Sequence, residues 1–197
     1  PQFTQQPADT LLMVGASAYI QVLANRALPV NTVGKTAKVY VGVTGSPKLV
    51  YQWVKNGKPI PNAIKNKLSL KKVDPGKDGG TYSVTITNAV GEVTSNDFTV
   101  TIIDPVKITQ HPLKNGVTEG TSGGLSITAT GGGTLAYQWK KYDAKKLLWN
   151  EIPGATSADL TFGSMSADDA GRYLCTVSNG ASTLTSKYAD LALHLLP

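Results

Sequence analysis

Cysteine, histidine and long apolar runs are scarce in this sequence. Cys175 is the only cysteine among 197 residues, so no disulfide can form within the chain. The two histidines, His111 and His194, are far apart, and no C-x-x-C, H-x-x-x-H or D-x-D-x-D-G spacing offers a metal site. No apolar run approaches the roughly 18–20 residues that cross a bilayer, and no basic start followed by a hydrophobic stretch signals export. We therefore expect no metal, no cofactor and no membrane insertion.

Catalytic signatures are missing as well. The sequence contains no G-x-S-x-G motif and no phosphate-binding glycine loop. No long segment holds the 3.6-residue period of a helix between plausible caps. The 41% of hydrophobic residues argues against disorder. We expect a folded protein that is not an enzyme.

The sequence contains an internal repeat that covers nearly the whole chain. The triplet Y-Q-W begins at Tyr51 and again at Tyr137, and DGGTYSVTITN (78–88) returns as DAGRYLCTVSN (169–179). The lead-ins FTQQP and ITQHP agree too. The repeat predicts two modules of one kind, residues 1–104 and 105–197, joined by a short connection.

Each module has the pattern of a β-sandwich. Polar and apolar residues alternate in 38–43, 82–86 and 98–102, which is typical of strands with one buried face. Asn56-Gly57 is a strong signal for a two-residue hairpin turn. About seven short strands in each hundred residues predict an all-β fold.

The motif D-x-G-x-Y occurs in both modules and resembles the corner before strand F of immunoglobulin-like domains, with Y-Q-W supplying the core tryptophan of strand C. The resemblance covers nearly the whole chain. It implies two tandem immunoglobulin-like β-sandwiches without disulfides. The framework residues it implies are Val41, Trp53, Asp78, Tyr82 and Val84 in the first module, and Ile127, Trp139, Asp169, Tyr173 and Cys175 in the second.

The resemblance also identifies the positions where related domains carry a disulfide between strands B and F. Here Val41 would face Val84, and Ile127 would face Cys175. Loss of such a bridge typically costs about 2–5 kcal/mol, which apolar packing must replace. We interpret Cys175 as a small buried hydrophobe rather than a reactive thiol. The pattern favours folding in a reducing cell interior.

The first module carries about 19 extra residues near 23–43. Strand B could be 20–22 or 39–43, since both stretches fit. Either choice predicts an additional loop or hairpin around 24–38 that projects from the sandwich. Such insertions often carry binding residues, and this one contains Arg26, Lys35 and Lys38. The alternative is a longer edge strand with a mobile loop.

Positive charge is concentrated in the first module. Residues 1–104 hold eleven Lys and Arg against six Asp and Glu, a net charge of +5, whereas residues 105–197 have a net charge of +1. Such a surface steers a module towards acidic partners, although a solvated face without a partner is the alternative. We do not expect nucleic acid as a partner, because interleaved aromatics and a groove-reading helix are missing. The lysines that we take as binding candidates are Lys48, Lys55, Lys58, Lys65, Lys67, Lys71 and Lys72.

In the second module, the segment 142–154 predicts an extended loop containing Leu147, Leu148 and Trp149. Trp149 is a further binding candidate, for a sugar ring or a protein, but packing back onto the sandwich is the favoured reading.

The first module has a W-x-K-N-G turn at 53–57, and the second has an I-P-G-A-T-S-x-x-L segment at 152–160. Tandem modules with these features are similar to those of bacterial surface proteins and of tailed-phage virions, such as the highly immunogenic outer capsid protein. The resemblance implies a capsid decoration protein on the virion surface, made in the host cytoplasm. Its expected partners are capsid or tail proteins and, weakly, acidic polysaccharide of the host surface. The alternatives are a bacterial cell-surface adhesin and an accessory binding module of an enzyme.

Overall fold

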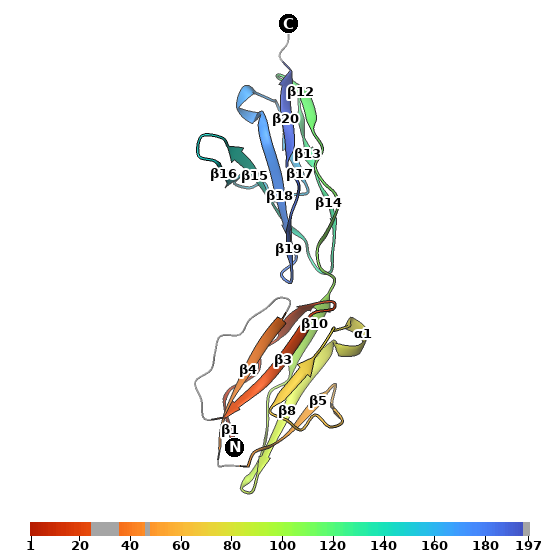
Figure 1. The fold of residues 1–197 in the computed structure, drawn as a ribbon, viewed down its shortest axis with the longest axis vertical. Coiled ribbons are helices and arrows are strands. Elements are labelled where there is room, and N and C mark those ends of the chain that lie inside the picture. Colours follow the sequence, from red (N-terminus) through yellow and green to blue (C-terminus); the bar gives the residue numbers. More distant parts are fainter. Residues whose placement is uncertain (25–35, 46–47, 195–197) are drawn as a thin grey trace. The chain divides into compact units, whose positions relative to one another are not determined.

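The computed structural model describes residues 1–24, 36–45 and 48–194, and these residues confirm the expected all-β fold (Figure 1). The chain divides into two compact units, 1–104 and 105–197. Helical structure in the described ranges is limited to two short turns, α1 (Pro75–Asp78) and the 3-10 turn η1 (Ala167–Asp169).

The first unit contains two β-sheets. One has the strand order β1-β4-β3-β7, and the other the order β2-β10-β8-β5-β6 with β9 paired to β8. The strands of the first sheet are β1 (Gln2–Gln5), β3 (Ser17–Ala24), β4 (Thr36–Thr44) and β7 (Lys67–Leu70). Those of the second are β2 (Thr10–Met13), β5 (Val50–Lys55), β6 (Lys58–Pro59), β8 (Gly80–Asn88), β9 (Gly91–Thr94) and β10 (Phe98–Ile103).

The second unit repeats this plan with shorter pairings on one side. Its larger sheet has the order β12-β20-β18-β15-β16, with β19 paired to β18, and the opposite side consists of the pairs β11-β14 and β13-β17. The strands are β11 (Lys107–Gln110), β12 (Asn115–Thr118), β13 (Gly123–Ser126), β14 (Thr128–Thr130), β15 (Ala136–Asp143), β16 (Leu148–Glu151), β17 (Asp159–Phe162), β18 (Gly171–Ser178), β19 (Thr183–Thr185) and β20 (Ala189–His194).

A fully buried tryptophan lies in the core of each unit. Trp53 and Trp139 have no exposed surface, and each indole N–H donates to a backbone carbonyl, that of Lys65 at 2.8 Å and that of Ser157 at 2.9 Å. The bond satisfies the one polar atom of the ring, so that burial stabilises each unit without a desolvation cost.

The four positions expected to replace the disulfides are all buried. Val41, Val84 and Cys175 have no exposed surface, and Ile127 is 4% exposed. Val41 and Val84 belong to the apolar core of the first unit, and Ile127 and Cys175 to that of the second. Cys175 is a free thiol, and burial raises its pKa to about 11.

A tyrosine closes the corner before strand F in both units, where strand F corresponds to β8 in the first unit and β18 in the second. The hydroxyls of Tyr82 and Tyr173 donate to the carbonyls of Asp78 and Asp169, at 2.7 and 2.5 Å. Burial is the main cause that raises the pKa of both phenols to about 12. The carboxylates of the same aspartates accept backbone N–H bonds from Asp74 and Ser166, which fixes the short turns α1 and η1.

The two ends of the insertion do not pair as in the predicted hairpin. Both candidate stretches for strand B are strands, β3 and β4, and they pair in parallel rather than antiparallel as in a hairpin. Residues 36–38 therefore belong to the sheet. Residues 25–35, the middle of the predicted loop, lie outside the described ranges.

Candidate functional site

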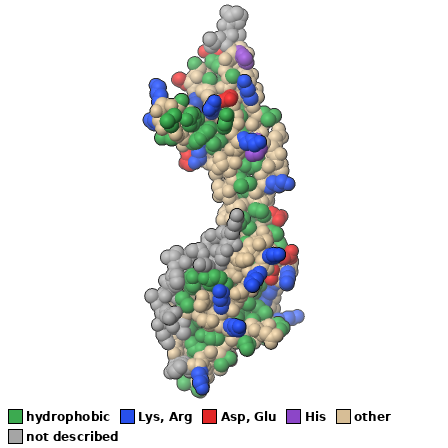
Figure 2. Space-filling view, in the orientation of Figure 1, with side chains coloured by type: hydrophobic (Ala, Val, Ile, Leu, Met, Phe, Trp, Pro, Cys, Tyr) green, Lys and Arg blue, Asp and Glu red, His purple; other side chains and the backbone are tan. Residues whose placement is uncertain are grey.

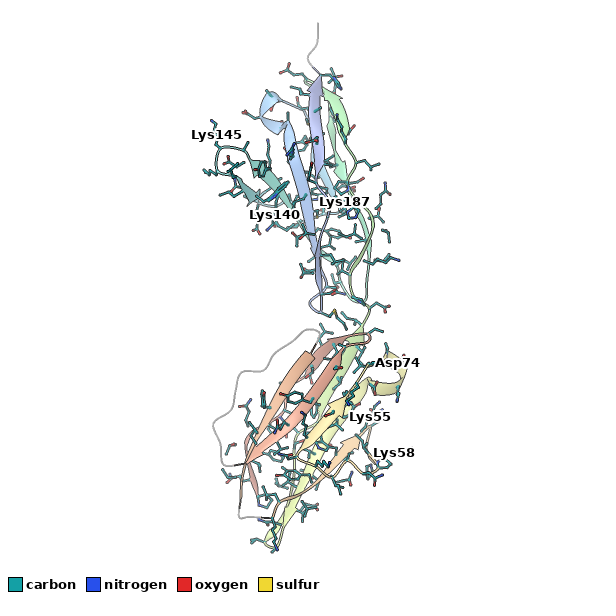
Figure 3. All side chains as sticks on the ribbon, in the orientation of Figure 1. Lys55, Lys58, Asp74, Lys140, Lys145 and Lys187 are labelled. Atoms are coloured by element: carbon teal, nitrogen blue, oxygen red, sulfur yellow. The ribbon has the colours of Figure 1, made fainter. Side chains whose placement is uncertain are left out.

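The lysines proposed as a binding face lie on several elements of the first unit. Figure 3 labels Lys55 at the end of β5 and Lys58 on β6, which belong to one sheet, whereas Lys67 lies on β7 of the other. The remaining candidates occupy connections: Lys48 precedes β5, Lys65 precedes β7, and Lys71 and Lys72 follow it. Lys38 lies on β4, and Arg26 and Lys35 are outside the described residues.

β6 and β7 are each the last strand in the order of their sheet, so Lys58, Lys65 and Lys67 follow one edge of the sandwich. Lys38 on β4 and Lys48 before β5 lie elsewhere, so the candidates do not form one flat patch. Figure 2 shows several lysine side chains on this unit with few carboxylates between them. All of them except the partly buried Lys55 are exposed where their side chains are described. Among the candidates whose side chains are described, no ammonium group lies within 4 Å of a described carboxylate. The described ion pairs, such as Lys140–Glu151 at 3.1 Å, belong to the second unit.

Lys55 has a structural contact that the sequence reading missed. Its ammonium donates to the carbonyl of Lys77 and lies 5.6 Å from the centre of the Tyr82 ring. Lys141, the equivalent residue of the second unit, donates to the carbonyl of Asp168 and lies 5.4 Å from the Tyr173 ring. The recurrence of lysine two residues after tryptophan was a visible signal. The lysine ammonium stabilises the tyrosine corner in both units.

Lys67 is also engaged, but on the outer face of its sheet. Its ammonium lies 3.8 Å from the centre of the Tyr19 ring, a cation–π contact. The Tyr19 ring in turn packs edge-on against Tyr40, with the ring centres 6.4 Å apart and the two hydroxyls at 3.4 Å. That hydrogen bond is the first cause that raises the pKa of Tyr40. The surface beside Lys67 is therefore partly aromatic.

In the second unit, the candidate Trp149 lies on the β15–β16 hairpin. Its ring packs on Tyr142, directly opposite on β15, with ring centres 5.2 Å apart, so the tryptophan lies against the sheet. The adjacent Leu147 and Leu148 are 76% and 41% exposed. An open groove beside this hairpin is lined by residues that include Tyr142, Lys145 and Asp168.

Asp143 fixes the tip of this hairpin. Its carboxylate accepts the backbone N–H groups of Lys145 and Lys146 at 3.0 and 3.1 Å. The bond from Lys146 is the main cause that lowers the pKa of Asp143, with help from Lys145 and from the Lys146 ammonium. Leu147 follows with a φ of 55°, an unfavourable conformation for leucine. The hairpin thus presents two leucines on a well-defined turn.

A buried serine in each unit also escaped the sequence reading. The hydroxyl of Ser186 accepts the backbone N–H of Cys175 at 2.9 Å, and Ser95 does the same for Val84 at 3.0 Å. Both serines are 7% exposed. They hold strand F at the position where related domains carry the disulfide.

No group of three or more potential metal ligands occurs among the described residues. Within the same ranges, no helix has the length and apolar character needed to span a membrane.

Comparison with known proteins gives the same fold. Residues 26–102 match the immunoglobulin I-set domain family, and residues 105–179 match an immunoglobulin domain family. Among curated proteins, the tyrosine-protein phosphatase Lar of Drosophila melanogaster is 27% identical over 177 residues, covering 81% of this chain and 9% of Lar. The cell adhesion molecule DSCAML1 of Mus musculus is also 27% identical, covering 76% of this chain and 8% of that protein. The chain thus spans less than a tenth of the length of these relatives.

Two solved structures illustrate the likeness. Extracellular domains 3–5 of Drosophila OTK superpose with a TM-score of 0.66 at 18% identity, covering 98% of this chain and 61% of that one. The three N-terminal domains of the highly immunogenic outer capsid protein of bacteriophage RB49 give 0.57 at 14% identity, with coverages of 98% and 69%. Immunoglobulin domains of this kind are generally non-catalytic, and one curated relative is described as a cell adhesion molecule. The chain consists of two immunoglobulin-like domains in tandem.

Proposed function

We propose that this chain is a non-enzymatic binding protein displayed on a phage particle, most simply as a decoration of the capsid. The observation that carries the proposal is the disulfide-free core of both domains. Val41 and Val84 in one domain, and Ile127 and Cys175 in the other, fill the disulfide positions with buried apolar groups. Such domains fold without an oxidising compartment, as a protein assembled onto particles in a bacterial cytoplasm must.

The surface supports attachment through one domain. The exposed lysines around β6 and β7, without described carboxylate partners, favour an acidic surface on the particle or on a host polysaccharide. The exposed leucines of the β15–β16 hairpin suit a weak contact by the second domain. Many copies on one particle would add such weak contacts into strong attachment.

The test mixes the purified chain with undecorated capsids and counts the copies that sediment with them. Saturable binding that weakens when Lys58, Lys71 and Lys72 are changed to Glu is the expected result. Retention of binding after this reversal would contradict docking by the lysines, and failure to bind any capsid would contradict the virion role.

A second candidate is an adhesin on a cell surface, which the likeness to the cell adhesion molecule DSCAML1 favours. Immunogold labelling of infected and uninfected producer cells separates the two roles. Labelled virus particles support the first proposal, and labelled cell envelopes in the absence of particles support the second.

A further inference from the structure

The two domains differ in the strands that occupy the position of strand B. The second domain fills it with one continuous segment, and the first domain with two separate strands. In the second domain, β13 pairs with β17 and the immediately following β14 pairs with β11. In the first domain, the equivalent pairings belong to separate strands: β3 pairs with β7, and β4 pairs with β1. The sheet therefore contains β3 and β4 side by side at the place of a single strand B (Figure 1).

The two strands have matching sequences. Residues 14–22 read VGASAYIQV and residues 33–41 read VGKTAKVYV, so both follow the pattern V-G-x-[ST]-A-x-[IV]-x-V with an offset of 19 residues. The parallel pairing has the same offset at all of its positions, from Ser17 opposite Thr36 to Ala24 opposite Val43. Each residue of one strand therefore lies beside its counterpart in the other.

Both strands also contribute to the same core. Ile20 and Val22 of β3, and Val41 and Val43 of β4, are at most 1% exposed. The match to the I-set family begins at residue 26, so it includes β4 and leaves out β3, whereas β3 is the strand beside β7 in the structure. The family match and the pairing beside β7 thus include different copies.

We propose that β3 and β4 are two copies of one strand and that they can exchange places beside β7, by a shift of 19 residues. After exchange, Ala37, Val39 and Val41 take the positions of Ala18, Ile20 and Val22, which preserves the apolar pattern.

The outward residues change, however, because Lys38 takes the place of Tyr19. The cation–π contact of Lys67 with Tyr19 is then replaced by a second ammonium group nearby. The exchanged form keeps the same net charge but groups Lys38 with Lys67, so an anionic partner that contacts both ammonium groups binds it preferentially and shifts the population towards it.

Disulfide trapping tests the exchange directly. Gln21 lies opposite Lys67 in the structure, so Gln21→Cys with Lys67→Cys gives a bridge when β3 is beside β7. In the exchanged form, residue 40 takes the position of Gln21, opposite Lys67. In the structure β3 separates β4 from β7, so residue 40 is two strand spacings, about 9–10 Å, from β7 and beyond disulfide reach. A Tyr40→Cys, Lys67→Cys bridge therefore reports the exchanged form alone.

Both pairs are made in a Cys175→Ala background and oxidised under mild conditions, with Thr44→Cys, Lys67→Cys as the matched control. Residue 44 lies four positions further along β4 and meets Lys67 in neither arrangement. We expect bridges in the first two variants and none in the control. A bridge in only one of the first two, or equal bridging in the control, overturns the exchange.

Two reciprocal deletions test the equivalence of the copies. Removal of residues 15–33 joins Val14 to Gly34 and keeps the second copy, and removal of residues 24–42 joins Leu23 to Val43 and keeps the first. Both variants are expected to fold with Trp53 buried, as slow hydrogen exchange of its indole N–H reports. An unfolded first domain in either variant contradicts the duplication.

Discussion

The substitution Ile127→Cys introduces the partner that Cys175 lacks. Both side chains lie in the core of the second domain, and the family resemblance places them at the two ends of the usual bridge between strands B and F. If strand B is correctly aligned, the new thiol lies within reach of Cys175. Oxidation is then expected to join the two residues and close a loop of about 48 residues.

Two opposing effects set the size of the change. With the thiols reduced, the variant loses part of a buried side chain, and interpolation between Ile→Val and Ile→Ala gives a loss of about 1–3 kcal/mol in the free energy of unfolding. With the bridge formed, a loop of this length adds about 4 kcal/mol. Oxidised and reduced forms should therefore differ by about 4 kcal/mol, roughly 15–30 °C in the melting temperature of a domain of this size.

Thermal unfolding with and without reductant measures this difference, and mass spectrometry confirms the loss of two hydrogens. Leu125→Cys is the matched control, because Leu125 is also buried but lies two residues earlier. A variant that folds yet forms no bridge on oxidation, or a control that forms one equally well, would refute the placement of residue 127 opposite Cys175.

Three further predictions concern buried polar contacts and charge. Ser186→Ala leaves the backbone N–H of Cys175 without its partner and should cost about 1–3 kcal/mol in urea unfolding, whereas a loss below about 0.5 kcal/mol would contradict that role. Lys55→Met should lower the urea midpoint of the first domain, because it removes the contact with the tyrosine corner, whereas Lys58→Met should not. Both variants should bind more weakly to a column that carries an acidic polysaccharide. Equal stability of the two variants would contradict the corner contact. The pKa of Cys175 is raised to about 11 and that of Tyr173 to about 12, so the unfolded chain releases these protons at lower pH than the folded one. Stability should therefore be unaffected by these groups below about pH 8 and fall as the pH rises towards 11–12, and urea midpoints that stay constant over that range would contradict their burial.

Much of the fold could be read from the sequence because its framework residues recur in both domains. Trp53 and Trp139, with the tyrosines of the corner, are large side chains whose spacing is fixed by strand length, and two copies in one chain make the pattern visible. The cores follow from alternation, since period-2 patterns directly identify the buried face of a strand.

The arrangement of the insertion could not be read in the same way. Alternation marks both 17–24 and 36–44 as strands but says nothing about which neighbour each one pairs with, and local reasoning favours an antiparallel hairpin. The 19-residue offset of the repeat held the missing information, because it equals the pairing register. The contact of Lys55 with the Lys77 carbonyl was not predicted for another reason. In the sequence, a lysine that donates to a backbone carbonyl cannot be told from a lysine that binds an acidic partner.

The free energy of unfolding of the intact chain, measured in urea with excess reductant and again without it, tests most directly whether apolar cores alone close the two sandwiches. Both domains should unfold cooperatively, each with a stability in the usual range of about 5–15 kcal/mol, and the two conditions should give the same values. A chain that is unfolded in reductant, or that gains stability when Cys175 is oxidised, would contradict a fold held together without a disulfide.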